Sequence, residues 1–155
     1  MTSGRALTLE RVYTVDDWYD GARSGAADYE GRPHAYRSLH LDFETWNPDE
    51  DRFELTPLSD EILSWMLERD ALFRRWDAER QAGRTAPGAE EPPALPADRA
   101  RYAELERLIA GAIERAGSRV VVRGVFEYGP QYGPIRAAVR WTPLEGSASG
   151  QGGRG

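Results

Sequence analysis

Two histidines and two carboxylates stand at even-numbered positions in the stretch "HAYRSLHLDFE", as His34, His40, Asp42 and Glu44. Alternate residues of a β-strand point to the same face, so the last three would project side by side, about 6.5 to 7 Å apart. From such a face they could converge on a metal ion or provide acid–base groups. The same pattern is typical of a solvated strand face, and we expect that ordinary role, with no metal bound.

A second candidate site lies in "WYDGARSGAADYEGRPHAY", residues 18–36, which combines turn-forming glycines with arginines and aromatic rings. Guanidinium groups could meet a carboxylate or phosphate there while tyrosine rings supply apolar walls. The candidate binding residues are Tyr19, Arg23, Tyr29, Arg32 and Tyr36. In the alternative interpretation, the glycines only shape turns and the arginines form exposed ion pairs with Asp16, Asp17, Asp20 or Asp28, so that losing either arginine costs little stability.

Composition and motifs exclude several chemistries. The chain has no cysteine, which excludes disulfides, zinc–thiolate sites, iron–sulfur clusters and cysteine nucleophiles. "NPDEDRFELTPL" begins like a calcium-binding loop but has Arg52 and Leu58 where that loop needs glycine and glutamate. Glycine-rich phosphate loops and the GxSxG nucleophile motif are also missing from the sequence. We therefore expect no cofactor.

The net charge of -6 is unevenly distributed along the chain. Residues 41–70 carry ten acidic side chains against two arginines, whereas residues 118–155 carry five arginines against two acids. Overall acidity argues against non-specific binding to nucleic acid, although it leaves room for a local basic face. No apolar run approaches the roughly 20 residues that span a bilayer, and the start lacks the apolar core of a secretory signal, so we expect a soluble cytoplasmic protein without membrane contact.

Hydrophobic periodicity predicts a strand over residues 7–15, with Leu7, Leu9, Tyr13 and Val15 on its apolar face. A hairpin follows that turns at Glu30–Gly31, and Pro33 places its second strand at a sheet edge or at a strand start. On that second strand we expect the wetter face to carry His34, Tyr36, Ser38, His40 and Asp42, opposite Ala35, Leu39, Leu41 and Phe43.

Farther along, a short strand covers 52–57, and Ser59 followed by two acids predicts a helix from about Asp60 to Gln81. A second helix begins near Pro96 or Ala97 and ends at Gly117, before two strands joined by "GPQYGP". This order predicts an α+β fold, in which an antiparallel sheet of about five strands could curl into a partial barrel, with two helices inserted between its N- and C-terminal strands. We expect a single domain over 1–145, an exposed proline-rich connector at 83–96 and a disordered tail at 146–155.

The stretch "YDGARSGAADYEGRPHAY", together with "FELTPLSDE" and "LFRRWDAER", resembles a group of small bacterial proteins to which no activity is assigned. The resemblance covers roughly residues 12–105. It implies a single-domain cytoplasmic protein, and it supplies no substrate, cofactor or catalytic residue.

We therefore expect a small non-catalytic binding or accessory module that contacts an unidentified partner protein through residues 18–36. The absence of every strong catalytic motif favours this function over catalysis. The alternative is a hydrolase or nuclease-like enzyme that uses His34 or His40 with Asp42 and Glu44. The sequence indicates no oligomeric state.

Overall fold

The computed structural model describes residues 8–18, 21–39, 51–85 and 93–144. The chain divides into two compact units, one formed by Met1–Pro57 with Gly117–Gly155 and the other by Leu58–Ala116. The first unit is a β-barrel and the second contains both long helices. The predicted α+β class, with an antiparallel sheet and two helices between its N- and C-terminal strands, is confirmed.

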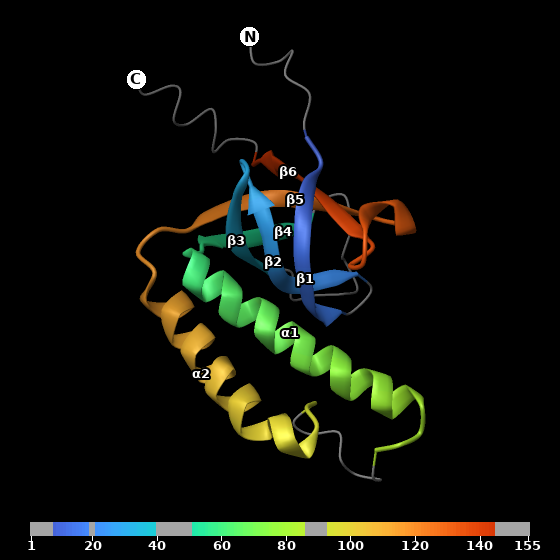
Figure 1. Ribbon diagram of the computed structural model, residues 1–155. Helices are drawn as coiled ribbons and strands as arrows, with labels where there is room; N and C mark the ends of the chain where they lie inside the picture. Colours follow the sequence, from blue (N-terminus) through green and yellow to red (C-terminus); the bar gives the residue numbers. More distant parts are fainter. Residues whose placement is uncertain (1–7, 19–20, 40–50, 86–92, 145–155) are drawn as a thin grey trace, which may run out of the picture. The chain divides into compact units, whose positions relative to one another are not determined.

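The sheet of the first unit has six strands and closes on itself (Figure 1). Every pair of neighbouring strands is antiparallel, and β6 returns to pair with β1 through Glu10↔Val139 and Arg11↔Ala138. The strands are β1 (Glu10–Trp18), β2 (Ala22–Tyr29), β3 (Arg32–Ser38), β4 (Arg52–Pro57), β5 (Val120–Tyr128) and β6 (Ala137–Pro143). The expectation of about five strands in a partial barrel is wrong, because the closing β1–β6 pair joins segments that are far apart in the sequence.

The β2–β3 hairpin turns where the sequence predicts it. Glu30 and Gly31 have φ values of 56° and 78°, as a two-residue turn of this twist requires. The carboxylate of Glu10 accepts hydrogen bonds from both turn amides, at 2.8 Å from Glu30 N and 2.9 Å from Gly31 N. Pro33 is the second residue of β3, so it marks a strand start; a closed barrel offers it no edge.

Gly31→Val should destabilise the barrel by about 1–3 kcal/mol, because a branched residue is strained at positive φ. A Cβ atom at Gly31 would meet no atom within 4 Å, so the cost comes from the backbone alone. Gly117→Val is the matched control, since Gly117 also has open space around its Cβ position but no positive φ. Urea unfolding of the two variants measures the difference, and equal losses would contradict a strained turn.

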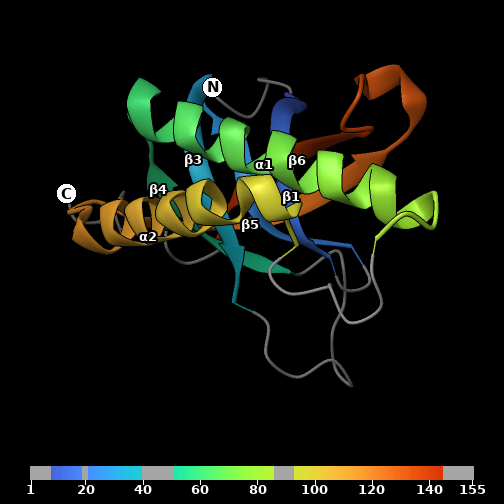
Figure 2. The ribbon, with the colours of Figure 1, turned by 60° about the horizontal axis from the view of Figure 1, so that its bottom comes forward.

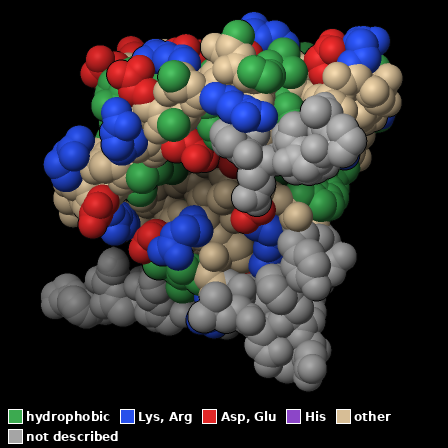
Figure 3. Space-filling view, turned by 90° about the horizontal axis from the view of Figure 1, so that it is seen from below, with side chains coloured by type: hydrophobic (Ala, Val, Ile, Leu, Met, Phe, Trp, Pro, Cys, Tyr) green, Lys and Arg blue, Asp and Glu red, His purple; other side chains and the backbone are tan. Residues whose placement is uncertain are grey.

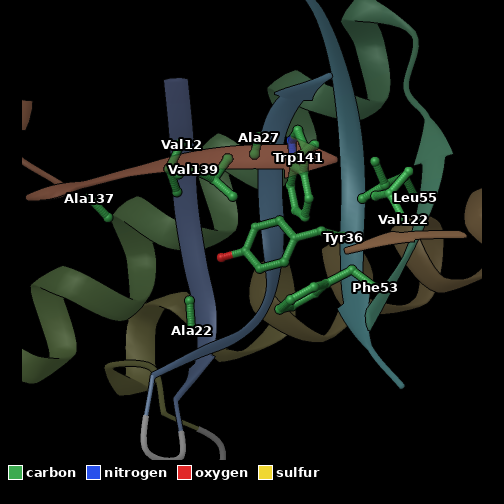
Figure 4. Packing of buried hydrophobic residues seen from close by; sticks show 10 residues of the cluster. All are labelled: Val12, Ala22, Ala27, Tyr36, Phe53, Leu55, Val122, Ala137, Val139 and Trp141. Atoms are coloured by element: carbon green, nitrogen blue, oxygen red, sulfur yellow. The ribbon is translucent and has the colours of Figure 1, made fainter. Parts of the chain in front are cut away.

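Aromatic rings fill the barrel interior, as Figure 4 shows for Tyr36, Phe53 and Trp141. Phe126 packs against all three, with ring centroids 5.2 to 5.8 Å away. The Tyr36 hydroxyl donates to the Thr14 carbonyl oxygen at 2.9 Å, which satisfies the one polar group that this ring carries into the core. The prediction that Tyr36 and His34 lie on the wetter strand face is wrong, because closure of the sheet turns that face inward and buries both.

The buried face of β1 also differs from the prediction. Val12 and Thr14 are buried, whereas Tyr13 is half-buried and Val15 packs only partly against the core. The pairing between β1 and β2 shifts register between Val12 and Thr14 and again after Val15. Such irregularities break the strict alternation on which the predicted face of Tyr13 and Val15 depends.

The second unit pairs α1 (Asp60–Gln81) with α2 (Arg99–Arg115), which lie side by side in Figures 1 and 2. The Ser59 hydroxyl accepts a hydrogen bond from Ile62 N at 3.2 Å, which confirms the predicted N-cap. Ion pairs join the two helices; Arg101 binds Glu68 through two contacts of 2.7 Å. A short 3-10 turn, Pro96–Asp98, precedes α2. None of the helices in the residues seen here is both long and apolar enough to cross a membrane.

Part of the predicted connector can be compared with the structure. Ala94 is fully buried, so an exposed connector is wrong at that position, while residues 86–92 lie outside the described residues. The predicted tail at 146–155 lies outside them as well.

On the face of the molecule drawn in Figure 3, arginine and acidic side chains are interspersed, in keeping with the many ion pairs between them.

Candidate functional site

Arg23 lies in a buried polar network near one end of the barrel. Its guanidinium donates to the Asp51 carboxylate at 2.8 Å and to the Ser38 hydroxyl at 2.7 Å. Ser38 in turn donates to the other Asp51 oxygen at 3.0 Å, which completes a triangle. Arg23 is 7% exposed and Asp51 4% exposed. The expectation of an exposed pair with a nearby aspartate is therefore wrong, because closure of the barrel buries Arg23 beside Asp51.

The other predicted binding residues do not gather around Arg23. Tyr29 pairs with Arg32 at the hairpin end of β2 and β3, six positions from Arg23 along β2. At a rise of about 3.3 Å per residue, those two ends lie roughly 20 Å apart. Arg32 is exposed there, and Tyr36 belongs to the core between the two ends. Tyr19 lies outside the described residues.

The hairpin end of the barrel holds His34. Its Nδ1 lies 2.8 Å from the Arg32 carbonyl oxygen, and because a carbonyl only accepts, Nδ1 carries the donated proton. The ring of Tyr29 packs edge-on against the imidazole at a centroid distance of 5.2 Å, and burial raises the pKa of Tyr29. His34 is itself buried, so it holds a structural position in the barrel.

The alternative catalytic set cannot be assembled from the described part of the chain. Of its four members only His34 is described, while His40, Asp42 and Glu44 lie outside the described residues. Among the residues that are described, no group of three or more His, Cys, Asp or Glu side chains could hold a metal ion. The hydrolase or nuclease-like alternative thus gains no support from an observed contact.

Two exposed aromatic residues, Trp18 and Tyr128, form a pair that the sequence did not reveal. Trp18 ends β1 and Tyr128 ends β5, and their rings meet edge to face at a centroid distance of 5.3 Å. Trp18 is 59% exposed and Tyr128 47% exposed. Exposed rings that contact each other from two different strands form a continuous apolar surface, which an isolated exposed ring does not.

The Tyr128 ring is held in place from below. Its hydroxyl accepts a hydrogen bond from Ala22 N at 3.0 Å, and its ring stacks on Phe126 with centroids 6.3 Å apart. Gly21 permits this approach, since a Cβ atom at that position would lie 3.3 Å from the Tyr128 hydroxyl oxygen. Burial raises the pKa of Tyr128, so its phenol stays protonated at neutral pH and can also donate a hydrogen bond.

No protein family model, curated protein or solved structure matches this chain. What the Trp18–Tyr128 pair can do follows from its chemistry. Each ring offers a large apolar surface with one polar atom at its rim, the indole N–H in one case and the phenol hydroxyl in the other. Such a pair can pack against apolar groups of another molecule and fix their orientation with one or two hydrogen bonds.

Proposed function

We propose that this chain is a small non-catalytic binding module that contacts a partner protein through the Trp18–Tyr128 pair. The observation that carries this proposal is the joint exposure of two contacting rings on a fixed backbone support. Tryptophan and tyrosine are enriched among the residues that dominate binding energy at protein interfaces. Rings that are already positioned lose little conformational entropy on binding, so more of the contact energy appears as affinity.

The packing of the barrel supports a contact on its outer surface. Tyr36, Phe53, Phe126 and Trp141 occupy the interior with mutual ring distances of 5.2 to 6.1 Å. Side chains of this size fill the interior of a small barrel, whereas larger barrels keep an open interior that can hold a ligand. The pair at the ends of β1 and β5 is continuous with this core through Phe126, which gives it a rigid base.

The test compares Trp18→Ser with Leu67→Ser, which removes an exposed apolar side chain from α1. A photoreactive residue at position 17, which is exposed and leaves Trp18 in place, or at position 67 first identifies the proteins that touch each surface in a lysate. Calorimetry with the purified partner then measures affinity. We expect Trp18→Ser to weaken binding by about 30-fold, the effect of losing a dominant interface residue, and Leu67→Ser to change it by less than about twofold.

Two results would overturn the proposal. One is a partner that binds Trp18→Ser as tightly as it binds the unmodified chain. The other is a set of crosslinked proteins that is the same from position 17 as from position 67. Trp18 is largely exposed, so its replacement should leave the barrel folded, and urea unfolding of the variant verifies this.

A further inference from the structure

Two arginines face each other across neighbouring strands on the outer wall of the barrel. Arg52 of β4 is in register with Arg123 of β5. Gly124 N–H donates to the Asp51 carbonyl oxygen at 3.0 Å, so these two residues form a hydrogen-bonded pair. Because the two kinds of pair alternate along antiparallel strands, Arg52 and Arg123, the next pair along, are a non-hydrogen-bonded pair. In such pairs the Cα atoms are only about 4.5 Å apart and the side chains are at their closest.

Strand alternation places both arginines on the outside. Phe53 follows Arg52 and is buried in the core, and Val122 and Gly124 on either side of Arg123 are buried as well. Because successive side chains of a strand point to opposite faces, Arg52 and Arg123 point away from the interior. Arg52 is exposed and Arg123 is half-buried.

Among the described residues, no carboxylate pairs with either arginine of this pair. Glu54, on the same wall, forms an ion pair with Arg37 at 2.8 Å. Glu127 lies 3.3 Å from Arg140 and accepts a hydrogen bond from the Tyr132 hydroxyl. Within the described ranges, neither Arg52 nor Arg123 forms an ion pair, and the buried Nε of Arg123 has no hydrogen-bond partner. Like charges directly opposite each other destabilise a sheet, and a buried donor without a partner adds a further cost.

A hydroxyl extends the pair into a row. Arg123 is in register with Thr142 of β6 on its other side, so Arg52, Arg123 and Thr142 follow one another across three strands of the outer wall. We call these three residues the arginine row. Arg140 lies diagonally next to it, since it pairs with Val125, two positions beyond Arg123. All three members of the row are hydrogen-bond donors, and two of them are cationic.

We propose that the arginine row binds a phosphate group, either as the free ion or as a monoester on a small molecule or peptide. A phosphate monoester carries a charge of about -1.5 to -2 and three terminal oxygens, which match two guanidiniums and one hydroxyl. A carboxylate has one charge and would leave half of the pair unbalanced. The chain's net charge of -6 repels long polyanions, so a single compact phosphate fits better than nucleic acid.

Titration calorimetry with inorganic phosphate at constant ionic strength tests this site directly. We expect saturable binding at one site, weakened about tenfold or more in Arg52→Gln and in Arg123→Gln, because each loses charge-assisted hydrogen bonds. Arg32→Gln is the control, since Arg32 is an exposed arginine of the same barrel at the hairpin end of β2 and β3, and it should bind within about twofold of the unmodified chain. Titrations with a phosphoserine peptide and a nucleoside monophosphate distinguish the carriers, and tighter binding of either supports the site.

Stability without phosphate provides a second readout. Arg123→Gln should be at least as stable as the unmodified chain in phosphate-free buffer, because it relieves the repulsion from Arg52. Absence of a saturable signal, or unchanged binding in both glutamine variants, would overturn the proposal. If Arg123→Gln unfolds, the phosphate affinity of Arg52→Gln alone tests the proposal, since Arg52 is exposed and its replacement should leave the barrel folded. Trp18→Ser should bind phosphate normally, so this site and the proposed protein contact can fail independently.

Discussion

Arg23→Ala should lower the free energy of unfolding by about 3–5 kcal/mol, the cost of leaving one partner of a buried ion pair without its counter-charge. The Asp51 carboxylate would remain buried and would keep only the hydrogen bond from Ser38 among its described side-chain contacts. Urea unfolding followed by circular dichroism measures the loss. The same experiment on Asp51→Ala should also show a loss, because the buried Arg23 guanidinium then lacks the carboxylate that lies 2.8 Å away.

Arg37→Ala is the control for Arg23→Ala. Its ion pair with Glu54 has the same length, 2.8 Å, but the Arg37 side chain is 63% exposed. Solvent screens such a pair, and its loss should cost about 0–1 kcal/mol. A double variant, Arg23→Met with Asp51→Leu, should recover much of the stability because no charge is left buried. Equal losses in Arg23→Ala and Arg37→Ala would contradict a structural role for the buried network.

Phe53→Ala should destabilise the barrel by about 3–5 kcal/mol, the usual cost of removing a buried aromatic ring. Phe53 is buried and its ring lies 5.5 Å from Phe126, 5.5 Å from Trp141 and 5.9 Å from Tyr36. Rings on neighbouring strands cannot collapse far into the space, so the lost contacts are not replaced. Urea unfolding monitored by near-ultraviolet circular dichroism reports directly on the packing of these rings.

The matched variant is Phe73→Ala, which removes a ring from the exposed side of α1. Because that ring is already partly hydrated, its removal should cost far less than the removal of Phe53. If both variants lost the same stability, the ring cluster would not be the main source of cohesion in the barrel.

Elements defined by neighbouring residues could be predicted from the sequence. Ser59 followed by acids predicts the start of α1, and Glu30–Gly31 predicts the β2–β3 turn, because capping and positive φ depend on local chemistry. Alternating apolar and polar residues predict strands β5 and β6 in the same way, and glycine and proline predict the loop between them. For these elements, tertiary packing agrees with local preference.

Features that depend on long-range pairing could not be predicted. Ala35 and Tyr36 are adjacent in β3 and both are buried, so alternation gives no clue to which of them points inward. The Asp51 partner of Arg23 and the Tyr128 partner of Trp18 come from strands that only closure of the barrel brings near. The site residues therefore depended on the sheet order, which no local pattern in this sequence reveals.

The pairing of β1 with β6 also determines when this protein can fold. During synthesis, β1 and its hairpin partners leave the ribosome long before β6, the strand that completes the circle. Until then the outer edge of β1 offers unpaired N–H and C=O groups to other nascent chains. The helices α1 and α2 lie within one continuous stretch of the chain, so they can pair before β6 has been synthesised. The barrel is thus prone to aggregation until Pro143, the last residue of β6, has left the ribosome. A chaperone that covers the β1 edge during this period would prevent pairing with other chains.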